Sequence, residues 1–146
     1  MYGRPDRRPG ANPYQSVSVD TASPAARLLM LFDGSIRFCR RAIRCMERDD
    51  IAGKGVYIGK AQAIVQEFQA SLRHDVAPEL CDQLTTLYAY IVDLFTQANL
   101  QNETFIIDEA IQLLETLRAG FAEAVEAAPS SQGTSGDKAS LGRSEP

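Results

Sequence analysis

Apolar residues recur every three or four positions along the middle of this chain, with polar residues between them. That spacing is typical of amphipathic helices, and no stretch shows the alternation of a strand. Start and stop signals mark four helical segments. The first begins at Ser23-Pro24, a capping serine followed by a proline at the first helical position, and ends near Asp49. The second has Asp50 as its cap and ends before Pro78.

Three glycines, at 53, 55 and 59, weaken the first turns of the second segment, so that its start is expected to fray or to lie later. The third segment begins near Pro78-Glu79. The fourth begins after Asn102, with Glu103 in its first turn, where the helix dipole favours a carboxylate, and it fades at Glu126. Both carry regular seams for packing against other helices: Leu80, Leu84, Leu87, Ile91, Leu94 and Ala98, then Ile107, Ala110, Leu114, Leu117, Phe121 and Ala124.

The connections between successive segments are short, which requires neighbouring helices to run antiparallel. The sequence therefore predicts an all-α fold, an up-down-up-down four-helix bundle over residues 21–127. Both ends of the chain hold few apolar residues and cannot bury enough surface to become ordered. We expect residues 1–20 to form a flexible N-terminal arm and residues 128–146 a disordered tail.

The first, third and fourth segments carry more apolar residues than a bundle core requires, which is roughly three positions in seven. The extra residues lie seven apart, as Tyr88 and Phe95 do in the third segment. They form either wide core faces or an exposed groove for a partner peptide. The sequence leaves both alternatives open.

Composition excludes several classes of protein. The chain has 146 residues and a net charge of −4, with no secretory signal and no apolar run of the length that spans a membrane. Its acidity argues against nucleic acid as the main partner. The three cysteines and the single histidine have the spacing of no metal site and of no nucleophile–base arrangement. The sequence also contains no phosphate-binding loop motif. We therefore expect no enzymatic activity, no cofactor and no metal.

Charge is unevenly distributed along the chain. Residues 24–49 hold six arginines and three acids, whereas residues 103–126 hold six acids and one arginine. We interpret these as solvated faces, paired between the first and last helices and contributing little to stability. A second interpretation is that the arginine cluster contacts phosphate.

A histidine phosphotransfer module, which is also a helical bundle with one exposed histidine, is the alternative function. His74 lies at the predicted end of a helix, before Pro78, rather than in the middle of one. The helix dipole alone favours a histidine there. Phosphorylation of His74 by a kinase distinguishes this alternative.

Several short motifs occur along the chain in a distinctive order and spacing. The opening motifs are Asn-Pro-Tyr at 12–14, Val-Asp-Thr-Ala-Ser-Pro at 19–24 and Leu-Leu-Met-Leu-Phe-Asp-Gly-Ser-Ile-Arg-Phe at 28–38. The later motifs lie at residues 60–65, 87–91, 98–99 and 113–118. Together they resemble one protein family, the FliS family of flagellar secretion chaperones, over about residues 12–125.

The resemblance implies a cytoplasmic chaperone that binds the C-terminal segment of flagellin, blocks its premature polymerisation and delivers it to the flagellar type III export gate, without ATP or metal. A monomer or weak homodimer with no membrane insertion is expected. The N-terminal segment resembles the family's mobile arm. We hypothesise that Tyr14 and Val17 dock on the empty groove and leave when flagellin binds.

Candidate client-contact residues are those that are apolar but outside the main seams, or that lie near a groove edge. For one of them, Phe95→Asp is expected to weaken client binding while helicity stays nearly intact. The candidates are Tyr14, Leu31, Phe38, Tyr57, Tyr88, Phe95, Ile106 and Leu113.

Overall fold

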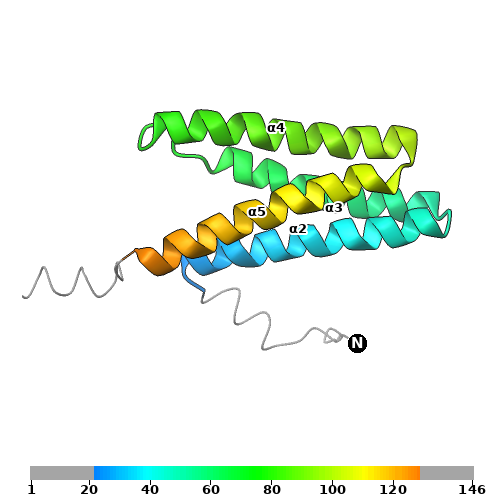
Figure 1. The fold of residues 1–146 in the computed structure, drawn as a ribbon, viewed down its shortest axis with the longest axis horizontal. Helices are drawn as coiled ribbons and strands as arrows, with labels where there is room; N and C mark the ends of the chain where they lie inside the picture. Colours follow the sequence, from blue (N-terminus) through cyan, green and yellow to red (C-terminus); the bar gives the residue numbers. More distant parts are fainter. Residues whose placement is uncertain (1–21, 129–146) are drawn as a thin grey trace, which may run out of the picture.

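The structure is a computed structural model that describes residues 22–128. Its elements are the helices α2 (Pro24–Glu47), α3 (Ile51–Ala70), α4 (Pro78–Gln101) and α5 (Thr104–Ala127). They form an antiparallel up-down-up-down bundle, with no strand among the described residues (Figure 1). The predicted fold class is therefore confirmed. Most of the predicted arm and tail lies outside the described residues.

Local capping signals set the helix starts. The Ser23 hydroxyl oxygen accepts a hydrogen bond from the backbone N–H of Ala26 at 3.1 Å, and the Asp50 carboxylate accepts one from Gly53 at 2.9 Å. Each satisfies an amide that has no partner within its own helix. Asp49 and Asn102 adopt left-handed backbone conformations, with φ of 58° and 59°, at the two tightest turns. Both residue types tolerate that region, so the chain reverses within a few residues.

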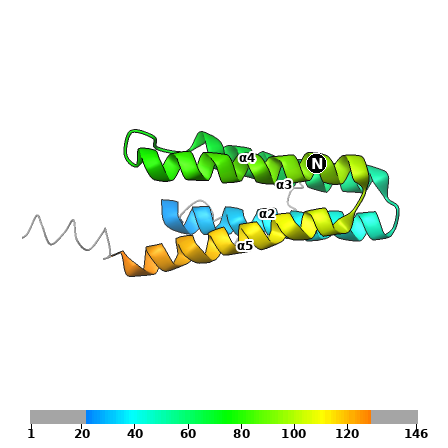
Figure 2. The same ribbon diagram turned by 45° about the horizontal axis from the view of Figure 1, so that its top comes forward.

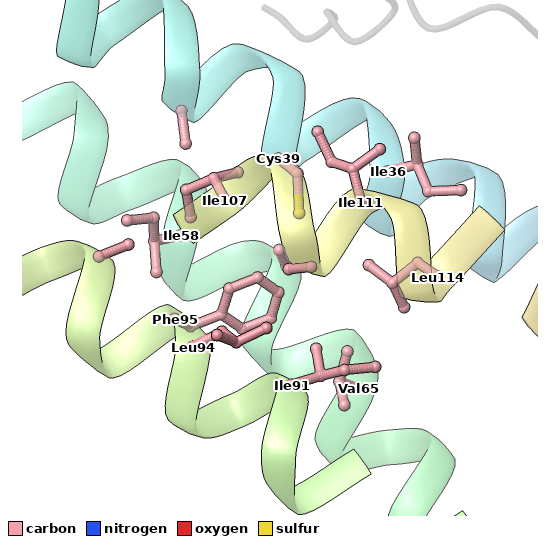
Figure 3. Packing of buried hydrophobic residues seen from close by; sticks show 14 of the residues in the cluster. Ile36, Cys39, Ile58, Val65, Ile91, Leu94, Phe95, Ile107, Ile111 and Leu114 are labelled. Atoms are coloured by element: carbon pink, nitrogen blue, oxygen red, sulfur yellow. The ribbon is translucent and has the colours of Figure 1, made fainter. Parts of the chain in front are cut away.

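Each helix packs against two neighbours: α2 and α4 both lie between α3 and α5 (Figures 1 and 2). All four helices contribute side chains to one continuous hydrophobic core (Figure 3). Phe32 of α2 packs on Phe68 of α3, with ring centroids 4.4 Å apart, and Phe68 packs in turn near Tyr88 of α4. This core is the rigid frame on which the surface features are held.

Three candidate contact residues are core residues, and the prediction that they lie outside the core is wrong. Tyr88, Phe95 and Ile106 are at most 5% exposed. The reason is that every helix has two neighbours, so its buried face is wider than a single seam. Figure 3 shows Phe95 pointing into the space between the helices. For these residues, the wide-core-face alternative is correct.

One lysine is buried at the end of the bundle where α3 begins. Lys54 is 5% exposed, and its Nζ donates hydrogen bonds to the Asn99 carbonyl oxygen at 3.2 Å and to the Asn102 side-chain oxygen at 3.1 Å. Its positive charge lies against the C-terminal end of α4, where the helix dipole favours a cation. Lys54 thus ties α3 to the turn between α4 and α5.

Replacing Lys54 with methionine is expected to lower the free energy of unfolding by about 1–3 kcal/mol, because both acceptor oxygens lose their donor while shape is nearly conserved. Urea unfolding followed by circular dichroism measures this. Lys60→Met is the control, since Lys60 is on the same helix but exposed. Equal unfolding midpoints for the two variants would contradict a structural role for Lys54.

Candidate functional site

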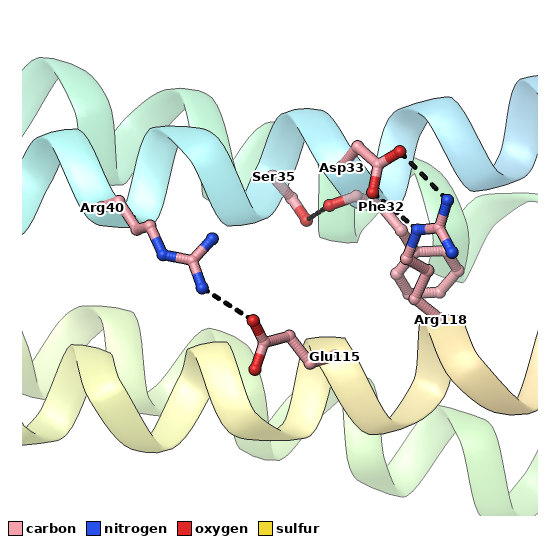
Figure 4. A network of polar contacts seen from close by, with 6 residues as sticks. All are labelled: Phe32, Asp33, Ser35, Arg40, Glu115 and Arg118. Atoms are coloured by element: carbon pink, nitrogen blue, oxygen red, sulfur yellow. Dashed lines mark hydrogen bonds and ion pairs between the residues drawn. The ribbon is translucent and has the colours of Figure 1, made fainter.

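Helices α4 and α5 lie close together at the tight turn where α4 ends and α5 begins, and they diverge toward the other end of the bundle (Figures 1 and 2). Two ion pairs link α5 to α2. The Arg118 guanidinium binds the Asp33 carboxylate through two hydrogen bonds of 2.6 and 3.2 Å, and Arg40 binds Glu115 at 2.7 Å (Figure 4). Both pairs are exposed and contribute little individually. They confirm the predicted pairing of charged residues between the first and last helices.

The divergence leaves an open groove of about 330 Å³ between the N-terminal half of α4 and the C-terminal half of α5. We call it the α4/α5 groove. Apart from one threonine, its lining is apolar or glycine. It is lined by Leu80, Leu84, Leu87, Leu113, Thr116, Leu117, Gly120, Phe121 and Ala124.

Most of the groove wall consists of seam residues that the sequence places in the core. The seam is buried near the turn, where Ile91, Leu94, Ile107 and others pack inward. Toward the open end it is not covered: Leu80 is 52% exposed, and Leu117 and Phe121 are only half-buried. The continuous seam is therefore core at one end and groove wall at the other.

Two further hollows continue the apolar surface around the open end of the bundle. A hollow of about 230 Å³ shares Leu80, Leu84 and Phe121 with the α4/α5 groove and reaches Leu28 of α2. The next, of about 180 Å³, lies along α2 and α3 and includes Leu31. Together the three form a track from α5 to the beginning of α2.

Charge around the groove has one sign. Helices α4 and α5 carry eight carboxylates and one basic residue, Arg118. That arginine is held by Asp33 on the α2 side. Glu79 and Asp82 flank Leu80 on α4, and Glu123 lies between Phe121 and Ala124 on α5; all three carboxylates are exposed. The groove is an apolar surface with an acidic border.

Comparison with known proteins agrees with this arrangement. The family model described as flagellar protein FliS matches residues 7–128. The chain is a member of the FliS family. The flagellar secretion chaperone FliS of Bacillus subtilis (strain 168) is 33% identical over 113 residues, which cover 77% of this chain and 84% of that protein. The flagellar secretion chaperone FliS of Escherichia coli (strain K12) is 31% identical over 121 residues, covering 80% and 89%.

A solved structure shares the fold of this FliS family member. The crystal structure of a flagellar chaperone from bacteria superposes with a TM-score of 0.68 at 21% sequence identity, covering 80% of this chain and 97% of that one. At that identity the likeness concerns the fold alone. It places the described helices in the architecture of a known chaperone.

Of the five remaining predicted contact residues, four lie in the described part of this FliS family member, in three places. Leu113 is a wall of the α4/α5 groove, and Leu31 is in the adjoining track. Phe38 and Tyr57 are half-buried and stack at 6.1 Å between α2 and α3, where Lys60 and Arg41 lie over their rings. Tyr14 and Val17, the two residues expected to dock on the empty groove, lie outside the described residues. A role in client contact stays a prediction for all of these residues.

The groove residues that sequence reasoning missed had no distinctive signal in the seam itself. The spacing and the apolar side chains of these residues are both typical of a core; they are Leu80, Leu87, Leu117 and Phe121. Gly120 gave a weak signal, because it lies among the regularly spaced apolar residues Leu117, Phe121 and Ala124 and has no side chain of its own. A glycine inside a helix lowers its stability, so it calls for a local reason.

The described part of this FliS family member offers little chemistry for catalysis. It contains no group of three or more His, Cys, Asp or Glu residues that could hold a metal ion. Burial raises the pKa of Cys39 to about 12, so its thiol is protonated and a poor nucleophile near neutral pH. His74 is exposed in the connection between α3 and α4. Across residues 22–128, no helix combines the length and apolarity needed to cross a membrane.

Proposed function

We propose that this chain is a cytoplasmic export chaperone that binds the C-terminal segment of flagellin, prevents its premature polymerisation and delivers it to a gate component of the flagellar type III export apparatus. Membership of the FliS family supports a role in flagellar export. The single structural observation that carries client binding is the uncovered α4/α5 groove, an apolar surface with no occupant from the described chain. Exposed contiguous apolar surface of this kind marks partner sites.

The physical basis is substitution of one apolar burial for another. In this proposal the client segment hides its apolar face only when it packs against other flagellin subunits. The groove offers equivalent burial, at about 25 cal/mol per Å² of apolar surface removed from water. A client held in this way has no free apolar face with which to polymerise.

The required size of the contact explains why the groove does not stand alone. Ordering a disordered segment costs about 2–5 kcal/mol, and complexes that do so bury about 1,000–3,000 Å². A single groove of about 330 Å³ holds only a few side chains. We infer that the client continues from the groove into the hollow of about 230 Å³, which shares wall residues with the groove, and from there into the hollow of about 180 Å³, which shares Leu28 and Phe68 with the second.

Titration calorimetry of the full chain with a peptide of the flagellin C-terminal segment tests the proposal. Saturable binding with a negative heat-capacity change is expected, because apolar surface is buried. An equally long peptide from the flagellin N-terminal segment is the control, and the chain should also delay polymerisation of flagellin monomers in a light-scattering assay. Absence of binding to the C-terminal peptide would overturn the proposed function.

A further inference from the structure

Gly120 lies on the floor of the α4/α5 groove, in the interior of α5. With Thr116 and Ala124 it forms a row of three residues spaced four apart, and such residues lie on one face of a helix. At 1.5 Å per residue the row is about 12 Å long. The facing wall on α4 is made of large side chains, Leu80 and Leu84 among them. The α5 wall combines this row with the large side chains of Leu113, Leu117 and Phe121, and Gly120 is its one position without a side chain.

Nothing in the described structure requires a glycine at this position. Its φ is not positive, so the backbone conformation suits any residue. A Cβ atom built on Gly120 would meet no atom within 4 Å apart from those of its chain neighbours and of the surrounding backbone of α5. Gly53 is different, because a Cβ there would collide with Asp50 and with Cys45 Sγ. Since glycine weakens a helix interior relative to alanine, Gly120 lowers the stability of α5 without serving the free fold.

We infer that Gly120 is a specificity-determining residue: it is the point at which the backbone of a bound client helix comes closest to α5. The inference rests on the function proposed above and identifies the part of the surface that selects the client. The distance between two packed helices depends on the side chains at their contact. A missing side chain on one helix allows the other to approach closely, which is a general use of glycine.

The charges around the groove specify the occupant further. The exposed charged residues that flank the groove are the carboxylates Glu79, Asp82 and Glu123. A helix with an apolar stripe in the groove therefore fits best with small residues facing Gly120 and with lysine or arginine beside the stripe. The acidic border disfavours a helix with carboxylates at those positions, because like charges repel.

The test uses the full chain with Gly120→Ala and, as a larger step, Gly120→Leu, and the peptide of the flagellin C-terminal segment as probe. Gly120→Ala is expected to raise the melting temperature of the free protein by about 4–8 °C, because alanine favours the helix and has room. The same change is expected to raise the Kd for the peptide about tenfold, and Gly120→Leu to raise it further, because the added atoms overfill the contact. A variant that melts at a higher temperature and yet binds the peptide more weakly has not lost binding through damage to the fold.

Gly59→Ala is the matched control. Gly59 is also an exposed glycine inside a helix with open space around it, but it lines none of the three hollows. This variant should gain similar stability and keep the wild-type Kd. An unchanged Kd for both Gly120 variants, or an equal loss for Gly59→Ala, would overturn the inference while leaving the proposed function intact. Failure of the wild-type chain to bind the peptide would instead overturn the proposed function itself.

Discussion

Phe95→Asp is expected to unfold the chain, with loss of most of its helical circular dichroism at room temperature. Phe95 is fully buried among residues of all four helices. Truncation of a buried phenylalanine to alanine alone costs about 3–5 kcal/mol. A carboxylate without a partner adds a larger desolvation cost, and the whole stability of a domain is about 5–15 kcal/mol. The measurement is urea unfolding of the variant beside the wild type.

Phe105→Asp is the control for this substitution. Phe105 is 63% exposed and lies in the first turn of α5, where the helix dipole favours a carboxylate. We expect its free energy of unfolding to stay within about 0.5 kcal/mol of the wild type. A folded Phe95→Asp variant that merely failed to bind the client would show that Phe95 is a surface residue, as the sequence alone suggested.

Sequence reasoning located the helices because their boundaries depend on local chemistry. Ser23 and Asp50 act as the caps that their side chains predict, and Pro78 begins α4. The α3 glycines were expected to weaken its start, yet α3 begins directly after Asp50. Two contacts explain this difference. The first is the hydrogen bond from the Gly53 N–H to the Asp50 side chain, for which Gly53 leaves room, and the second is the hydrogen bond from the buried Lys54 to the Asn99 carbonyl oxygen. The second contact joins residues 45 positions apart, so no local pattern indicates it.

The groove could not be predicted from the sequence because a periodic seam identifies apolar side chains but not the separation of the helices that carry them. Leu80 and Leu94 are two heptads apart and so have the same place in the seam pattern, yet Leu80 is 52% exposed and Leu94 is 4% exposed. The difference comes from the divergence of α4 and α5 away from the tight turn at Asn102, since α5 runs along α2, to which two exposed ion pairs also link it. The extra apolar residues Tyr88 and Phe95, which suggested a groove, instead belong to the core to which all four helices contribute. The expected groove was therefore assigned in part to core residues, Tyr88, Phe95 and Ile106, whereas Leu113 and Leu31 do line the apolar surface.

Leu80→Asp is expected to weaken binding of the flagellin C-terminal peptide by about 10- to 100-fold while the free chain stays as stable as the wild type. Leu80 belongs to both the α4/α5 groove and the adjoining hollow, and it is 52% exposed in the free protein. Burial of the exposed half of this leucine by the client is worth about 0.8–1.5 kcal/mol, which the variant loses, and desolvating a carboxylate adds a further cost. The free fold tolerates the change because residue 80 is in the first turn of α4, where the helix dipole favours negative charge. Calorimetric titration gives the affinity, and urea unfolding gives the stability.

Leu100→Asp makes this result decisive, because Leu100 is a leucine on the same helix that is even more exposed, at 80%, but lies at the end where α4 and α5 meet. Aspartate in the last turn of a helix opposes its dipole, so this variant should be slightly less stable than Leu80→Asp. If only Leu80→Asp loses the client, neither added charge nor reduced stability accounts for the loss, and the open end of the seam is the binding surface. Equal binding by both variants would place the client elsewhere on the bundle, and the groove would then be unoccupied apolar surface without a role in recognition.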